Sequence, residues 1–102
     1  MSKEKKKVRE FFRACVYERD GNKCRVCKND KEPLDAHHIT DRNLLPNGGY
    51  VKENGISLCP SCHIKAEVFH STGKAFDDFH PNDLYKLINS SYDIAYKASL
   101  KL

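Results

Sequence analysis

Four of the five cysteines form two Cys-x-x-Cys pairs, which are Cys24 with Cys27 and Cys59 with Cys62. A Cys-x-x-Cys turn places two sulfurs about one ligand–ligand distance apart and leaves backbone amides to stabilise the thiolates. Two such pairs supply the four soft ligands that tetrahedral Zn²⁺ prefers. A redox dithiol is the alternative, but the thioredoxin-like strand–helix setting is missing and the second pair would have no role. The spacing therefore predicts a structural zinc site.

Three histidines lie close to these pairs in the sequence. His37 and His38 are adjacent, and His63 directly follows the last zinc-binding cysteine, Cys62. Neighbouring side chains of a strand point to opposite faces, so one imidazole of the pair can hold a metal ion while the other stays free. The residue types thus favour a metal-assisted hydrolytic site built on the zinc-held segment.

Several elements must position these residues. A helix is expected over residues 4–20, ended by the turn-forming Asp20–Asn22. Its apolar residues follow the i, i+3, i+4, i+7, i+8 spacing of one buried stripe, and they are Val8, Phe11, Phe12, Cys15 and Val16. Cys15 has no cysteine partner in the sequence pattern, and we expect it to be a buried free thiol that packs as a small hydrophobe.

The histidine pair falls in a predicted strand over residues 34–39, whose return partner is residues 56–58. A long loop containing Pro46 to Gly49 joins them. A helix is expected from Ser61 to Phe69, ended by Ser71–Gly73. Residues 81–100 predict one or two packing helices through the apolar residues Leu84, Leu87, Ile88, Ile94 and Ala95.

The composition limits the remaining choices. A chain of 102 residues forms one domain, residues 1–102, and a hydrophobic content of 39% makes its core thin enough to need a staple such as zinc. The net charge of +4 is compatible with a polyanionic partner. The basic residues from Lys3 to Arg13 form the main cluster of positive charge in the sequence. The lysine-rich N-terminus lacks a following apolar stretch, which predicts a cytoplasmic protein with no membrane association.

The order of these motifs resembles the HNH endonuclease family, in its subclass with two zinc-binding Cys-x-x-Cys knuckles, over about residues 13–70. The resemblance rests on the lead-in from Val16 to Cys24, the run from Asp35 to Ile39, Gly48-Gly49, and the run from Asn54 to His63. Small phage and prophage proteins often have this architecture. It implies an α+β fold: a small zinc-stapled ββα-metal, treble-clef-like core with flanking N- and C-terminal helices.

The resemblance also implies roles. His38 corresponds to the general base, His37 and His63 to ligands of a catalytic ion, and Asn54 to the residue that orients the base loop or binds the metal. The subclass usually has a further histidine four residues after the last one, but this chain has Glu67 there and His70 three residues beyond. Glu67 shares a helix face with His63, whereas His70 lies about 10 Å further along the axis. Glu67 is therefore the expected third ligand, with Asn54 and His70 left open.

As a member of that family, the chain would be a metal-dependent DNA endonuclease that leaves 5′-phosphate and 3′-hydroxyl ends. The cofactors would be a structural Zn²⁺ and a catalytic Mg²⁺, Mn²⁺, Ni²⁺ or Zn²⁺. Phosphate contacts are expected from Arg42, Lys65 and Arg25. No base-reading module is evident, which predicts double-stranded DNA cut with low sequence specificity by a monomer or homodimer. The alternative is a non-catalytic zinc-binding nucleic-acid-binding module.

Overall fold

The computed structural model describes residues 3–102, and the side chains from residue 5 onward. Helix α1 (Lys3–Arg19) precedes a two-stranded antiparallel hairpin of β1 (Asp35–His38) and β2 (Gly55–Leu58). Three further helices follow: α2 (Pro60–Thr72), α3 (Pro81–Leu87) and α4 (Tyr92–Ser99). The connection between the strands contains three 3₁₀ turns, η1 (Arg42–Leu44), η2 (Pro46–Gly49) and η3 (Lys52–Asn54). The expected α+β fold with flanking helices is confirmed.

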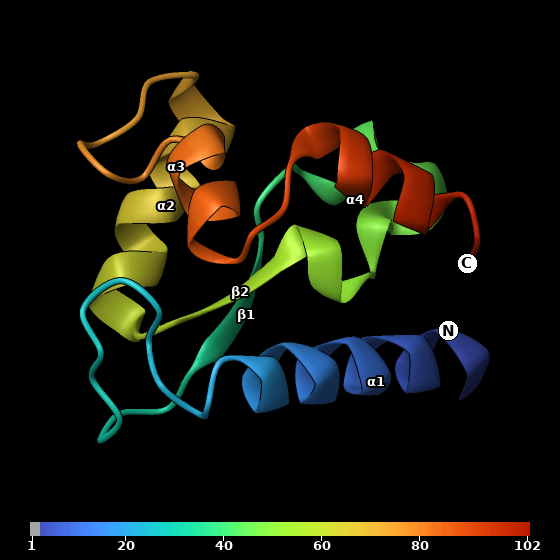
Figure 1. Ribbon diagram of the computed structural model, residues 1–102, viewed down its shortest axis with the longest axis horizontal. Coiled ribbons are helices and arrows are strands. Elements are labelled where there is room, and N and C mark those ends of the chain that lie inside the picture. The colour runs from blue at the N-terminus through green and yellow to red at the C-terminus, as the bar shows by residue number, and fades with distance from the viewer. Residues whose placement is uncertain (1–2) are drawn as a thin grey trace.

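The hairpin lies at the centre of the molecule, with α1 along one side and α2 and α3 on the other, while α4 packs over the turns between the strands (Figure 1). All four residues of β2 are buried, and β1 pairs with β2 so that His37 is opposite Ile56 and His38 opposite Gly55. Both histidines of the pair thus lie at the end of β1, between α1 and α2.

Helix α1 packs very closely against the hairpin at Gly55. Phe12 and Val16 are buried, and a Cβ atom on Gly55 would lie 2.5 Å from Cγ2 of Val16 and 2.7 Å from Cε1 of Phe12. A glycine is therefore needed at position 55 for the helix to approach this closely.

The predicted apolar stripe of α1 is correct for Phe12 and Val16 and wrong at its edge. Val8 and Phe11 are 40% and 71% exposed, and Cys15 is only partly buried. Because α1 touches the hairpin through Phe12 and Val16, spaced by four, Phe11 and Cys15 on the neighbouring side of the helix lie beside the contact. Val8 shares the face of Phe12 but lies one turn nearer the N-terminus.

Asp20 fixes the end of α1. Its carboxylate is buried, accepts a hydrogen bond from the backbone N–H of Ser57 at 2.8 Å and pairs with Arg19 at 2.8 Å. Arg25 lies on the opposite side, with its Nε 3.5 Å from the same carboxylate and its Nη2 donating to the carbonyl oxygen of Leu87. Through Asp20 and Arg25, the segment around the first cysteine pair therefore connects α1 to β2 and α3.

The C-terminal region forms two helices, as expected. Leu84, Ile88 and Ala95 are buried, whereas Leu87 and Ile94 are 36% and 46% exposed, contrary to the packing expected for them. Short helices of seven and eight residues offer only one face to the core. Within the part of the chain that the structure describes, no helix is long and apolar enough to cross a membrane.

Candidate metal centres and the histidine pair

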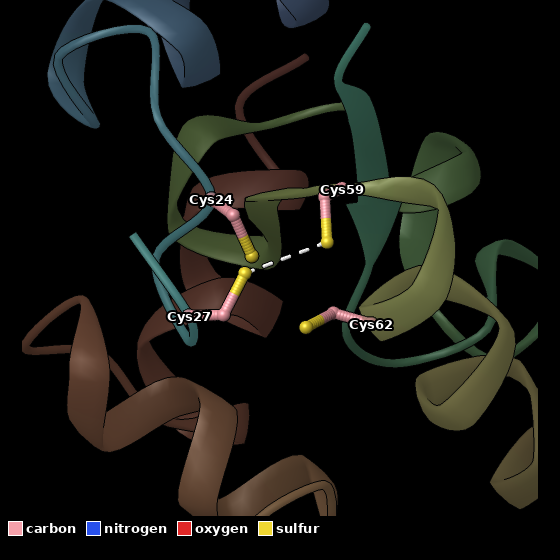
Figure 2. Close-up of side chains that lie close together, drawn as sticks. All are labelled: Cys24, Cys27, Cys59 and Cys62. Carbon is pink, nitrogen blue, oxygen red and sulfur yellow. Dashed lines mark hydrogen bonds between the residues drawn. The ribbon is translucent and has the colours of Figure 1, made fainter. Parts of the chain in front are cut away.

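The four paired cysteines meet in space, as Figure 2 shows. Their sulfurs all lie within 4.8 Å of one another, and the Sγ atoms of Cys27 and Cys59 are 3.5 Å apart. Zinc–sulfur bonds of about 2.3 Å in a tetrahedron require sulfur separations of about 3.8 Å, which fits this spacing. The cysteines are therefore positioned to form a zinc site.

Local turns hold each pair. In the first, the backbone N–H of Lys28 donates to the carbonyl of Cys24 at 2.9 Å, and Lys28 has a φ of 67°. In the second, Cys59 directly precedes α2 and accepts a hydrogen bond from the backbone N–H of His63 at 2.8 Å. Burial alone would raise the pKa of Cys24, but backbone amides, those of Cys27 and Cys59 foremost, outweigh it and lower the pKa to about 7. A thiol with this pKa is readily deprotonated for metal binding.

A second group of potential ligands lies between β1 and α2. It consists of His37, Glu67 and His70, whose ligand atoms all lie within 4.8 Å of one another. Glu67 and His70 are three residues apart on α2 and so share a face of the helix. The buried Nδ1 of His37 has no hydrogen-bond partner, although Oε1 of Glu67 is 3.3 Å away. This distance between two potential ligand atoms leaves them positioned to share a metal ion.

Electrostatics support this arrangement. Burial lowers the pKa of His37, which keeps its imidazole neutral. The contact with His37 lowers the pKa of Glu67 to about 2, although burial acts in the opposite direction. A neutral imidazole beside an ionised carboxylate is the protonation state that metal ligation requires.

His70 completes the group through its orientation. Its Nε2 lies 2.9 Å from the carbonyl oxygen of His38, which can only accept a hydrogen bond, so Nε2 carries the proton. Nδ1 is left with its lone pair free to bind a metal. Histidine ligands commonly donate their second N–H to a backbone carbonyl in this way.

His63 lies beside this group. Its Nδ1 is 3.1 Å from Oδ2 of Asp35 and its Nε2 is 3.0 Å from Oε1 of Glu67, so both ring nitrogens face carboxylates. Its ring centre is 5.3 Å from that of His37. Glu67 lies within reach of both His37 and His63, the two histidines it was expected to join, and His70, which the sequence left open, also lies in the group with His37.

His38 points to the other face of the hairpin. Its ring stacks on Phe12 of α1 at 4.6 Å and meets Tyr50 edge-on at 4.8 Å. Its Nε2 is buried and has no hydrogen-bond partner. Burial, with smaller contributions from His37 and Arg42, lowers the pKa of His38 to about 4. The ring is therefore neutral at pH 7 and borders a hollow of about 290 Å³.

Asn54 is fully buried and all its polar atoms are engaged. Its Nδ2 donates to the carbonyl oxygens of Thr40 at 3.1 Å and Gly49 at 3.3 Å. Its Oδ1 accepts from the N–H of Thr40 at 2.9 Å and from the hydroxyl of Tyr85 at 2.8 Å. This side chain holds the segment that follows His38. Tyr85 comes from α3, and no local sequence signal pointed to it.

The three expected phosphate contacts differ in their surroundings. Arg42 is exposed, donates to the hydroxyl of Tyr50 at 3.2 Å and borders the same hollow as His38. The Nζ of Lys65 lies over the ring of Phe79, 5.8 Å from its centre. The side chain of Arg25 is occupied within the fold, as described above.

Residues 24–68 match the family model described as HNH endonuclease. The match confirms the resemblance seen in the sequence and includes both cysteine pairs, the three predicted histidines and Glu67. It excludes α1, His70 and Tyr85. Comparisons with curated proteins and with solved structures gave no match.

Proposed function

We propose that this chain, whose residues 24–68 match the HNH endonucleases, is a metal-dependent DNA endonuclease that hydrolyses phosphodiester bonds. One observation carries the proposal. Two adjacent histidines place unpartnered buried nitrogens on opposite sides of one strand, with His37 facing potential metal ligands and His38 facing a hollow bordered by Arg42. A metal-binding group next to a free base is what hydrolysis of a phosphodiester needs.

The catalytic ion would be held by His37 and Glu67, with His70 or His63 as the further ligand. When bound, a divalent ion neutralises charge on the phosphate and stabilises the departing 3′-oxygen. The unpartnered Nδ1 of His37 is the observation that fits such an ion. Two imidazoles with one carboxylate suit Mn²⁺, Ni²⁺ or Zn²⁺, and Mg²⁺ remains an option because it is abundant.

His38, which borders the hollow, would accept a proton from the attacking water. Phe12 and Tyr50 hold its ring, and its low pKa keeps it neutral before substrate binds. A bound phosphate would raise this pKa, because negative charge favours the imidazolium that forms during the reaction. The hydroxide formed in this way would add to phosphorus, the bond from phosphorus to the 3′-oxygen would break, and a water molecule would protonate the departing oxygen, which leaves 5′-phosphate and 3′-hydroxyl ends.

The remaining parts of the proposal concern substrate and context. Double-stranded DNA cut with low sequence specificity is proposed, because charged side chains and not a base-reading element border the site. One histidine pair per chain suits nicking by a monomer, and a homodimer would cut both strands. The four cysteines would carry the structural Zn²⁺. We expect the protein to act in the cytoplasm of a bacterial or phage-infected cell.

A plasmid-nicking assay tests the function. Wild-type protein with Mn²⁺ or Mg²⁺ should convert supercoiled plasmid to the open circle, and His38→Ala should be slower by on the order of 100-fold or more. Lys97→Ala on α4, whose partner Asp93 is also exposed, is the matched control and should cleave like wild type. Equal cleavage by His38→Ala would refute the base assignment. Absence of cleavage by wild type with any divalent ion would instead favour a non-catalytic nucleic-acid-binding module.

A further inference from the structure

Helix α1 and the η1–η2 segment enclose a groove lined by positive charge, here named the basic groove and defined by Lys5, Arg9, Arg13, Arg42 and Tyr50. It consists of two adjoining hollows of about 620 Å³ and about 290 Å³. Arg9, Arg42 and Tyr50 border both hollows, which therefore lie next to each other. The larger hollow extends to Lys5, and the smaller one adds Arg13 and reaches His38.

The spacing of charges along α1 is regular. Lys5, Arg9 and Arg13 follow one another at intervals of four residues, so they lie on one side of the helix with about 6 Å of rise between them. That interval is comparable to the separation of successive phosphates along one nucleic-acid strand. No carboxylate is among the described residues that line the larger hollow, and Asp35 is the acidic residue bordering the smaller one.

Tyr50 organises the middle of the groove. Its hydroxyl accepts a hydrogen bond from Arg42 at 3.2 Å, and its ring packs edge-on against His38 and Phe12. Burial alone would raise the pKa of Tyr50, but the guanidinium groups of Arg42 and Arg9 outweigh it and lower the pKa. Both arginines border the same hollow as Tyr50 and His38.

Gly48 keeps the groove open. It has a φ of +80°, and a Cβ atom there would lie 2.8 Å from the ring of Tyr50. Any side chain at this position would therefore clash with the ring of Tyr50. The positive φ of Gly48 also favours glycine here.

We infer that the basic groove binds the backbone phosphates of the nucleic-acid strand that is cut, with Arg9 and Arg42 on the phosphates nearest His38 and Lys5 further along α1. That the bound strand is the one cut, and that its phosphates lead to His38, rests on the proposed function. The binding of a phosphodiester backbone rests on the groove alone. Because the contacts are charge pairs to phosphate, binding would be independent of sequence. Helix α1, which lies outside the family match, would then be the platform for the substrate.

Salt-dependent DNA binding tests the inference. The full chain carrying His38→Ala would be titrated, without added divalent ions, against a short fluorescein-labelled DNA duplex of mixed sequence, with anisotropy read at several NaCl concentrations. Each phosphate contact removed makes the negative slope of log K against log salt less steep by about 0.9. The expected result for Arg9→Ala with Arg42→Ala is a slope less steep by about 1.8 and affinity reduced on the order of tenfold. Lys97→Ala, which removes one positive charge from α4, should leave both unchanged.

Two results would overturn the inference. One is an equal loss of binding in the Arg9/Arg42 double variant and the Lys97 variant, and the other is no binding by the parent protein, which carries only His38→Ala. Arg13→Gln in the wild-type background, titrated in the same way, provides a second reading if His38→Ala impairs folding. The outcome is separable from that of the plasmid assay. Binding that depends on Arg9 and Arg42 without any cleavage would support the groove and refute the nuclease, whereas cleavage unaffected by these variants would refute the groove.

Discussion

The Nε2 of His70 donates to the carbonyl oxygen of His38, 2.9 Å away, and so joins the two sides of the candidate site. The side chain of His70 belongs to the group of potential metal ligands, while that of His38 faces the basic groove on the opposite side of β1. This contact fixes the side chain of His70 relative to the backbone of His38 at the end of β1. The geometry of this contact leads to the first prediction.

His70→Ala should weaken the binding of the catalytic ion more than His63→Ala does. Loss of a direct ligand, together with its hydrogen bond to the base segment, is expected to raise the Mn²⁺ concentration for half-maximal nicking by on the order of 100-fold. His63→Ala should raise it less, because the nitrogens of His63 face Asp35 and Glu67. The measurement is nicking rate against Mn²⁺ concentration for each variant. A larger shift for His63→Ala would place His63 in the first coordination shell instead.

Tyr85→Phe should impair both stability and turnover. The hydroxyl of Tyr85 bonds Asn54 at 2.8 Å and Thr40 at 2.6 Å in the interior, and losing buried hydrogen bonds costs about 1–3 kcal/mol. Because Asn54 holds the segment after His38, we expect kcat to fall while KM changes little. Urea unfolding and steady-state nicking measure the two effects. Tyr96→Phe, at an exposed position, is the control, and equal losses in both variants would count against a positioning role.

Cys27→Ser should release the structural zinc. Cys27 is the exposed member of the four-cysteine site, so serine there removes a ligand with little change in core packing. Metal analysis should find about one zinc per chain in the wild type and markedly less in the variant. Thermal unfolding followed by circular dichroism should show a large fall in stability, because structural zinc contributes on the order of 10 kcal/mol. Cys15→Ser should retain both zinc and stability. An unaltered zinc content in Cys27→Ser would remove the basis of the zinc assignment.

Acid should destabilise the fold through His38. Burial lowers its pKa to about 4 in the folded protein, whereas an unfolded chain has a histidine pKa of about 6.5. Between these values the unfolded state binds more protons, so stability is full above about pH 6.5 and is lost as the pH falls toward 4. His38→Gln should flatten this dependence. Chemical denaturation between pH 4 and 7 measures it, and identical profiles for wild type and His38→Gln would contradict the prediction.

The sequence was most informative where local geometry decides the outcome. The two Cys-x-x-Cys turns, the hairpin and the helix that begins at the second pair follow from short-range rules, and the cysteines meet as expected. The extent of burial on α1 could not be read in the same way, because periodicity identifies a helix face but not how wide its contact is. Phe11 is therefore exposed where a buried stripe was expected.

The group around His37 was harder to anticipate. Helical spacing relates His63 to Glu67 and Glu67 to His70 equally well, and only the position of β1 over α2 decides which of them meet His37. Tyr85 was missed for a similar reason: its partner Asn54 lies 31 positions away in the chain, and no local pattern relates the two.

The contacts of Phe12 and Tyr85 have a consequence for protein engineering. The span that matches the family contains all four cysteines and the histidine pair, yet the ring under His38 comes from α1 and the hydroxyl on Asn54 comes from α3. An excised 24–68 fragment would keep the four cysteines, His37 and Glu67, but it would lose His70 and the supports on both sides. The smallest segment that retains all of these contacts is therefore the stretch that begins before Phe12 and ends after Tyr85.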